Sequence, residues 1–87
     1  MKIVYHRHFE KQFQSLSPML KTKTIAAIAR FVHDPHDPLL RNHPLKGALL
    51  GKRAFSVTAS FRVVFEEYDH YAVVLMLSVG THNQVYR

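Results

Sequence analysis

The chain has 87 residues, of which 47% are hydrophobic, and it contains no cysteine. This length accommodates one core and one domain over residues 1–87, and the lack of cysteine excludes a disulfide framework and a thiolate metal site. Twelve lysines and arginines against six acidic residues give a formal net charge of +6. Such an excess attracts polyanions, so we expect a nucleic acid or an acidic protein as partner rather than a charge that only maintains solubility.

The N-terminal segment Met1 to Tyr5 lacks the long apolar run of a secretory signal. No apolar run elsewhere approaches the length of about 18 residues that a membrane span requires. The absence of cysteine also fits a reducing compartment. We therefore expect a cytoplasmic protein that has no membrane partner.

The first half of the chain predicts one strand and two helices. Residues 2–5 are β-branched and aromatic, as in a strand. Apolar residues then recur at helical spacing over about residues 7–15. Ser17 and Pro18 are a helix-start signal, so a second helix is expected over residues 18–33. The buried stripe of this second helix is expected to comprise Ile25, Ile28, Ala29 and Val32, preceded by Leu20 or Met19.

Two His-Asp-Pro repeats, at residues 33–35 and 36–38, end the second helix. Each proline disfavours helical geometry in the residue before it and lacks an amide donor. Turns before proline explain the repeats without a metal ion, so no metal site is expected there. Residues 39–51 are expected to form an irregular link.

From Lys52 the apolar period changes from 3.6 to 2, which is typical of strands. Strands are expected over residues 52–58, 61–67 and 71–79, with turns at 59–60 and 68–70. Gly80 is expected to end the last strand, and the tail from Thr81 to Arg87 is expected to be polar, with room for a short additional strand. The sequence therefore predicts an α+β fold of order β-α-α-β-β-β(-β), in which a helical hairpin packs on a mostly antiparallel sheet.

Cleavage of RNA without a metal requires a base for the ribose 2′-hydroxyl, an acid for the leaving oxygen and cations for the phosphate. Histidine, arginine, lysine and tyrosine supply these groups. The six acidic residues are scattered along the chain rather than clustered as magnesium ligands. We therefore expect neither a metal nor another cofactor.

Four segments carry a resemblance to a known family. They are His-Pro-Leu-Lys-Gly from His43, Gly-Lys-Arg from Gly51, Ser-Phe-Arg-Val-Val-Phe from Ser60, and Ser-Val-Gly-Thr-His-Asn-Gln-Val-Tyr from Ser78. In this order they resemble the RelE/ParE toxin superfamily, and within it the YafQ- and RelE-type messenger-RNA interferases. The resemblance extends over nearly the whole chain, because the N-terminal strand and helical hairpin occur there in the same order.

The resemblance implies roles for individual residues. His43 corresponds to an active-site imidazole, Arg62 to the strand arginine that contacts the scissile phosphate, and His82 to a general acid or base. Tyr86 corresponds to a C-terminal aromatic residue that stacks on a base or assists proton transfer. Each also has a purely structural interpretation: a surface loop for His82, a turn for His43, an ion pair for Arg62, and core or interface packing for Tyr86.

The remaining predicted RNA contacts are Lys46, Lys52, Arg53, Ser56 and Ser60, with solvated surface as the alternative. YafQ-like proteins have a histidine and an aspartate where this chain has Ser56 and Ser60. Part of that acid–base set is therefore missing, and we expect Arg62 to compensate. The exposed histidines His6, His8, His36 and His70 are assigned to the surface.

The resemblance implies a toxin of a type II toxin–antitoxin system that cleaves messenger RNA on the 70S ribosome by attack of the 2′-hydroxyl. It further implies a cognate acidic antitoxin, and contact with operator DNA only through that antitoxin. Two alternatives remain open. One is a gyrase inhibitor of the ParE type, and the other is an antitoxin- or nucleic-acid-binding relative that has lost catalysis.

Overall fold

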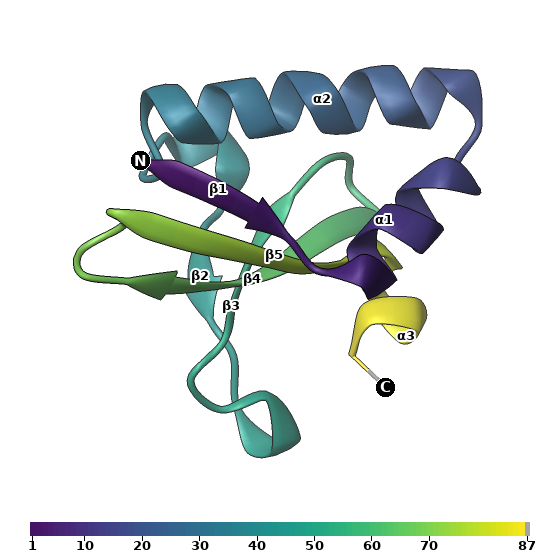
Figure 1. The fold of residues 1–87 in the computed structure, drawn as a ribbon. Coiled ribbons are helices and arrows are strands. Elements are labelled where there is room, and N and C mark those ends of the chain that lie inside the picture. The colour runs from purple at the N-terminus through teal and green to yellow at the C-terminus, as the bar shows by residue number, and fades with distance from the viewer. Residues whose placement is uncertain (87) are drawn as a thin grey trace.

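The computed structural model describes residues 1–86, which form three α helices and a five-stranded mixed sheet (Figure 1). The predicted α+β fold class is confirmed. In chain order the elements are β1 (Lys2–Tyr5), α1 (Arg7–Gln14), α2 (Pro18–His33), the 3-10 turn η1 (Pro38–Leu40), β2 (His43–Pro44), the 3-10 turn η2 (Gly47–Leu49), β3 (Arg53–Ser56), β4 (Phe61–Tyr68), β5 (Val73–Thr81) and α3 (His82–Val85).

The strand order in the sheet is β1-β5-β4-β3-β2, with β1 parallel to β5 and every other pair antiparallel. Helices α1 and α2 lie on one side of the sheet and α3 lies on the other (Figure 1). We call the side that carries Ala54, Val64 and Leu77, which pack with α3, the outer face. Within residues 1–86 no helix combines the length and the apolar character needed to cross a membrane.

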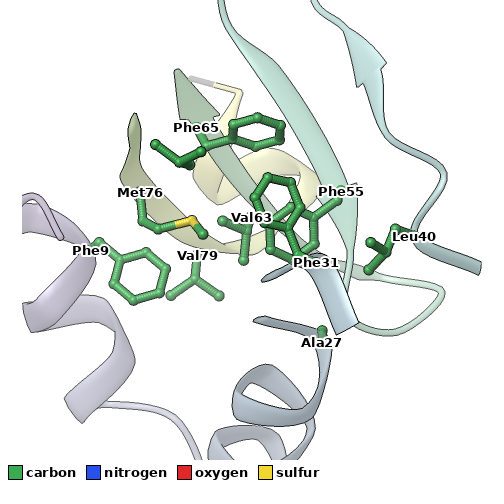
Figure 2. Close-up of a cluster of buried hydrophobic side chains, with 10 residues drawn as sticks. Phe9, Ala27, Phe31, Leu40, Phe55, Val63, Phe65, Met76 and Val79 are labelled. Carbon is green, nitrogen blue, oxygen red and sulfur yellow. The ribbon is translucent and has the colours of Figure 1, made fainter. Parts of the chain in front are cut away.

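The core lies between the inner face of the sheet and the two long helices (Figure 2). Phe31 of α2 is at its centre, with its ring stacked on Phe55 at 4.8 Å and edge-on to Phe65 at 4.9 Å between centroids. All three rings are almost fully buried. Aromatic pairs in such geometry add about 0.5–1.5 kcal/mol each beyond the burial of their area. This core fixes the sheet that carries the candidate site.

The predicted buried stripe of α2 is wrong. The buried residues are Thr24, Ala27 and Phe31, whereas Ile25 and Val32 are 59% and 46% exposed. Of the predicted set, Met19 and Ala29 are also exposed, and Leu20 and Ile28 are partly buried. Thr24 tolerates burial because its hydroxyl donates to the Leu20 carbonyl at 2.7 Å, which leaves no unpaired polar group.

The C-terminal prediction also differs from the structure. Strand β5 passes through Gly80 to Thr81, and the tail then forms α3 instead of a short last strand. The fifth strand is β2, within the predicted irregular link. Thr81 and Gln84 explain the helix, because their side chains cap its first turn reciprocally as a capping box. The last predicted tail residue, Arg87, lies outside the described residues.

The hairpin between β4 and β5 extends further than predicted. Asp69, His70 and Tyr71 have φ values of 54°, 53° and 68°, in the left-handed region, so β5 begins at Val73. Strand β3 also ends earlier than expected, at Ser56. The exposed positions expected for the four surface histidines are confirmed.

Candidate functional site

Arg62 is placed on the outer face by the register of the central strands. It lies opposite Ser56 of β3 and Gly80 of β5. Its neighbour Val63 faces the helices, and because side chains alternate along a strand, Arg62 projects from the other side. Gly80 has no side chain, so residues that follow β5 can approach the Arg62 side chain from that strand.

The element that follows β5 is α3, which brings His82 and Tyr86 to the same corner. The two rings meet edge to face, with centroids 4.3 Å apart and an interplanar angle of 81°. Tyr86 packs against the outer-face cluster that contains Ala54 and Val64. Since Val64 is the next outer-face residue after Arg62 on β4, these contacts bring Arg62, His82 and Tyr86 to one corner of the sheet. His82 is exposed there, and Tyr86 is half-buried.

His43 approaches this corner from β2, where it pairs with Ala54. Ala54 pairs in turn with Val64. Two strand spacings across the sheet and two residues along β4 give roughly 12 Å between the Cα atoms of His43 and Arg62. Both side chains are long enough to reach a phosphodiester placed between them.

The imidazole of His43 is held in one orientation. Its Nδ1 lies 2.7 Å from the Arg41 carbonyl oxygen, which can only accept a hydrogen bond. Nδ1 therefore carries the proton, and in the neutral ring Nε2 has a free lone pair. That arrangement presents a proton acceptor on a half-buried side chain.

Two polar atoms at this corner are buried and make no hydrogen bond within residues 1–86: Nε of Arg62 and Oη of Tyr86. Buried polar groups in folded proteins nearly always have partners, so such exceptions require a reason. A ligand-binding site supplies one if Arg62 and Tyr86 shift when the ligand binds, because the two atoms can then meet acceptor oxygens of the ligand.

Among residues 1–86, no acidic side chain pairs with the cations of this corner. The one salt bridge within residues 1–86 joins Arg30 to Asp37 at 3.2 Å, at the end of α2, so no carboxylate pairs with Arg62. Glu66, Glu67 and Asp69 lie at the far end of β4 and its hairpin. Over the same residues, histidine and acidic side chains nowhere form a group of three placed to hold a metal ion.

The other predicted contact residues fall into different places. Lys52 is half-buried and borders an outer-face hollow, and Lys46 is exposed at the start of η2. Ser56 lies opposite Arg62 but also borders a hollow beside α2, and Ser60 lies in the turn between β3 and β4. Arg53 lies apart from the outer-face corner. It precedes Ala54 on β3, so its side chain projects from the opposite face, and its Nε donates a hydrogen bond to Asn42 Oδ1 at 2.9 Å.

Asn42 has a structural role that the sequence did not indicate. Its Nδ2 donates to the Pro35 carbonyl and to the Tyr71 hydroxyl, each at 3.0 Å, while its Oδ1 accepts from Arg53. These bonds tie the residue preceding His43 to the end of α2, to β3 and to the β4–β5 hairpin. No local sequence pattern predicts such a network, because Asn42 and its bonded partners are up to 29 residues apart.

Comparison with known proteins places the fold. No protein-family model matches this sequence, and no curated protein sequence matches it. Among solved structures, YafQ from E. coli strain BL21(DE3) superposes with a TM-score of 0.81 at 17% identity, covering 99% of this chain and 98% of that one. The YoeB/ParE toxin from Agrobacterium tumefaciens gives 0.77 at 21%, covering 94% and 99%. The toxin–antitoxin complex RelBE2 from Mycobacterium tuberculosis gives 0.65 at 19%, covering 93% and 96%.

These matches confirm the resemblance to the RelE/ParE toxins at the level of the fold, over essentially the full length of the chain. A shared fold does not by itself carry an activity, since activity depends on the side chains of the site. Any activity therefore depends on the side chains at the outer-face corner, which are Arg62, His82 and Tyr86, and on His43 of β2.

Proposed function

From this shared toxin fold, we propose that the chain is the toxin of a type II toxin–antitoxin system and acts as a metal-independent endoribonuclease on messenger RNA. One observation carries the proposal: within residues 1–86, Arg62 and Tyr86 have buried polar atoms without hydrogen-bond partners at the corner that holds His82, and no carboxylate pairs with Arg62. A phosphodiester supplies acceptor oxygens for both atoms and a negative charge for the guanidinium.

The proposed chemistry gives the proton transfers to His43 and His82 and the stabilisation of charge to Arg62, while the Tyr86 hydroxyl donates to an oxygen of the phosphate or to the leaving oxygen. Nε2 of His43 accepts the proton of the ribose 2′-hydroxyl, and the 2′-oxygen attacks the adjacent phosphorus. Arg62 stabilises the charge on the phosphorane. It thereby compensates for the histidine and aspartate that YafQ-like proteins have in place of Ser56 and Ser60. The bond from phosphorus to the 5′-oxygen breaks, and His82 donates a proton to that oxygen. The products are a 2′,3′-cyclic phosphate and a 5′-hydroxyl end.

The proposed partners follow from charge and fold. Messenger RNA presented by the 70S ribosome in the cytoplasm is the substrate, with Lys46 and Lys52 contacting its backbone. A cognate acidic antitoxin covers the basic surface and links the complex to operator DNA. The RelBE2 structure, which superposes on this chain, is itself a toxin–antitoxin complex.

The test is to incubate the purified protein with translating ribosomes and map new 5′ ends. We expect cleavage at positions set by codon register, 5′-hydroxyl ends, and full activity in EDTA. A single 2′-deoxyribose at the cleavage position should abolish the cut, because it removes the nucleophile. His82→Ala and Arg62→Ala should each lower the rate at least about 100-fold.

His33→Ala is the matched control, because His33 is exposed at the end of α2, across the sheet from the site. It should retain the wild-type rate. Full cleavage activity in Arg62→Ala would contradict the mechanism. Inhibition of DNA supercoiling without RNA cleavage would instead support the ParE-type alternative, and neither effect would support a relative without catalysis.

A further inference from the structure

A second feature of the outer face is a hollow of about 280 Å³ between the start of α1, η2 and α3. Its polar wall contains His6, His8 and Lys52, and its apolar part contains Val64, Leu77 and Val85. Helix α3 and the start of α1, which border it, lie close together in Figure 1. None of the described residues that line it is acidic. The hollow therefore joins hydrogen-bond donors and a cation to an uncharged floor.

The imidazole of His6 is held by the backbone. Its Nδ1 accepts a hydrogen bond from the His8 amide at 3.0 Å and so caps the start of α1. Because Nδ1 is the acceptor, the neutral ring carries its proton on Nε2. His6 thus presents a fixed donor, while the exposed ring of His8 and the Lys52 ammonium group add further donors to the same hollow.

The hollow adjoins the candidate site along β4. Val64, in its floor, is two residues from Arg62 on the same face of the strand, which is a separation of roughly 7 Å. Pockets that enclose a whole drug-sized ligand begin at about 300 Å³, so this hollow has room for one ring system. A single-stranded RNA that passes Arg62 can therefore place one neighbouring nucleotide here.

We propose that this hollow binds one unpaired nucleotide next to the scissile phosphate. The base lies against Val64, Leu77 and Val85, and the phosphate accepts hydrogen bonds from His6, His8 and Lys52. The proposal rests on the proposed function only in placing the scissile phosphate at Arg62. The apolar floor and the polar wall together favour a nucleotide over a bare anion, because an anion has no apolar surface to pack against the floor.

The test measures binding of 2′-O-methyl RNA, which lacks the nucleophile and stays intact. Dissociation constants are measured by fluorescence anisotropy for a dinucleotide, which spans only the scissile position, and for a tetranucleotide, which extends beyond it. We expect His8→Ala and Lys52→Ala each to raise the dissociation constant of the tetranucleotide about tenfold. The dinucleotide should bind His8→Ala as it binds the wild type.

Two matched controls lie on α2, away from the outer face: His33→Ala and Lys23→Ala. Both should bind the tetranucleotide as the wild type does. Equal loss for both RNA lengths in His8→Ala, or loss for neither, would overturn the proposal. Unchanged RNA binding together with weaker binding of an acidic peptide would also overturn it, since the hollow would then serve a protein partner.

The same experiments test the proposed nuclease activity and the proposed nucleotide site independently. If the wild type cleaves no RNA but His8→Ala still loses affinity only for the longer methylated RNA, the nuclease assignment falls and the nucleotide site stands. If the wild type cleaves RNA and His8→Ala shows no dependence on length, the nucleotide site falls alone.

Discussion

The hydroxyl group of Tyr86 is buried without a hydrogen-bond partner within residues 1–86, so its removal separates folding from function. Tyr86→Phe keeps the ring that packs on His82 and removes only this oxygen. The free energy of unfolding should change by less than about 1 kcal/mol, because no hydrogen bond is lost. The rate of RNA cleavage should fall at least about tenfold, because the hydroxyl group no longer reaches the phosphate or the leaving oxygen. Urea denaturation and single-turnover cleavage measure the two effects.

Tyr71→Phe is the counterpart, because the Tyr71 hydroxyl accepts a hydrogen bond from Asn42 at 3.0 Å. It should lose about 1 kcal/mol of unfolding free energy, since the Asn42 amide is left without one partner. Its cleavage rate should change less than that of Tyr86→Phe. The opposite pattern in the two variants would exclude a functional hydroxyl at Tyr86.

Asn42→Ala removes all three bonds of the network beside His43. We expect a loss of about 2–3 kcal/mol in unfolding free energy, more than for Tyr71→Phe, because Arg53 and the Pro35 carbonyl also lose a partner. Because Asn42 lies between Arg41 and His43 in the chain, loss of its bonds should release the backbone there, move the Arg41 carbonyl away from His43 Nδ1 and free the tautomer of the ring, which ¹⁵N NMR of the imidazole reports. A ring that keeps its proton on Nδ1 in Asn42→Ala would show that the Arg41 carbonyl alone orients it.

Among the elements, α3 depends on Gly80. A Cβ atom at position 80 would lie 2.6 Å from Gln84 Oε1 and 3.1 Å from Gln84 Cβ. Gln84 Oε1 also accepts a hydrogen bond from the Thr81 amide at 2.8 Å, so it cannot move without breaking the cap. Gly80→Ala should therefore cost about 1–3 kcal/mol and displace His82 and Tyr86, with a loss of cleavage larger than the loss of stability implies.

The double variant Gly80→Ala/Gln84→Ala identifies the cause. If the clash with Gln84 is responsible, the two substitutions together should be less harmful than the sum of their separate effects, in a double-mutant cycle of unfolding free energies. Strict additivity would locate the damage elsewhere on β5.

The period of the apolar residues predicted most helices and strands, but it did not predict the buried face of every helix or the end of every strand. The sequence of α2 has two apolar stripes, and the pattern favoured the one with Ile25 and Val32. The core instead selected the stripe with Phe31, whose ring reaches Phe55 and Phe65. That choice depends on partners distant in sequence, which a local pattern does not contain. Helix α3 escaped prediction because four residues are too few for a helical period.

The candidate site was easier to predict by residue type than by geometry. The ordered motifs named Arg62, His82, Tyr86 and His43, whereas the strand register of the folded sheet was needed to show that Arg62 lies on the outer face. Arg53 was grouped with Lys52 by charge alone, although neighbouring residues on a strand project to opposite sides. The network of Asn42 was missed because its partners are brought together only by the folded sheet.

For the whole molecule, the distribution of charge matters more than the net value of +6. The proposed RNA path uses three cations on or beside the outer face, Arg62, Lys46 and Lys52, while the acidic residues of β4 lie at its far end. Each contact with a single strand contributes about −0.7 to the slope of log affinity against log salt concentration, so three contacts predict a slope of about −2.

Lys46→Ala/Lys52→Ala should therefore reduce the slope for 2′-O-methyl RNA to about −0.7, the contribution of Arg62 alone. Lys21→Ala/Lys23→Ala removes the same charge from α2 and should leave the slope at about −2, because those lysines lie across the sheet from the RNA. Fluorescence anisotropy between 50 and about 200 mM salt measures both slopes. Equal slopes in the two double variants would mean that the protein attracts RNA through its net charge alone, and the localised path over the outer face would have to be abandoned.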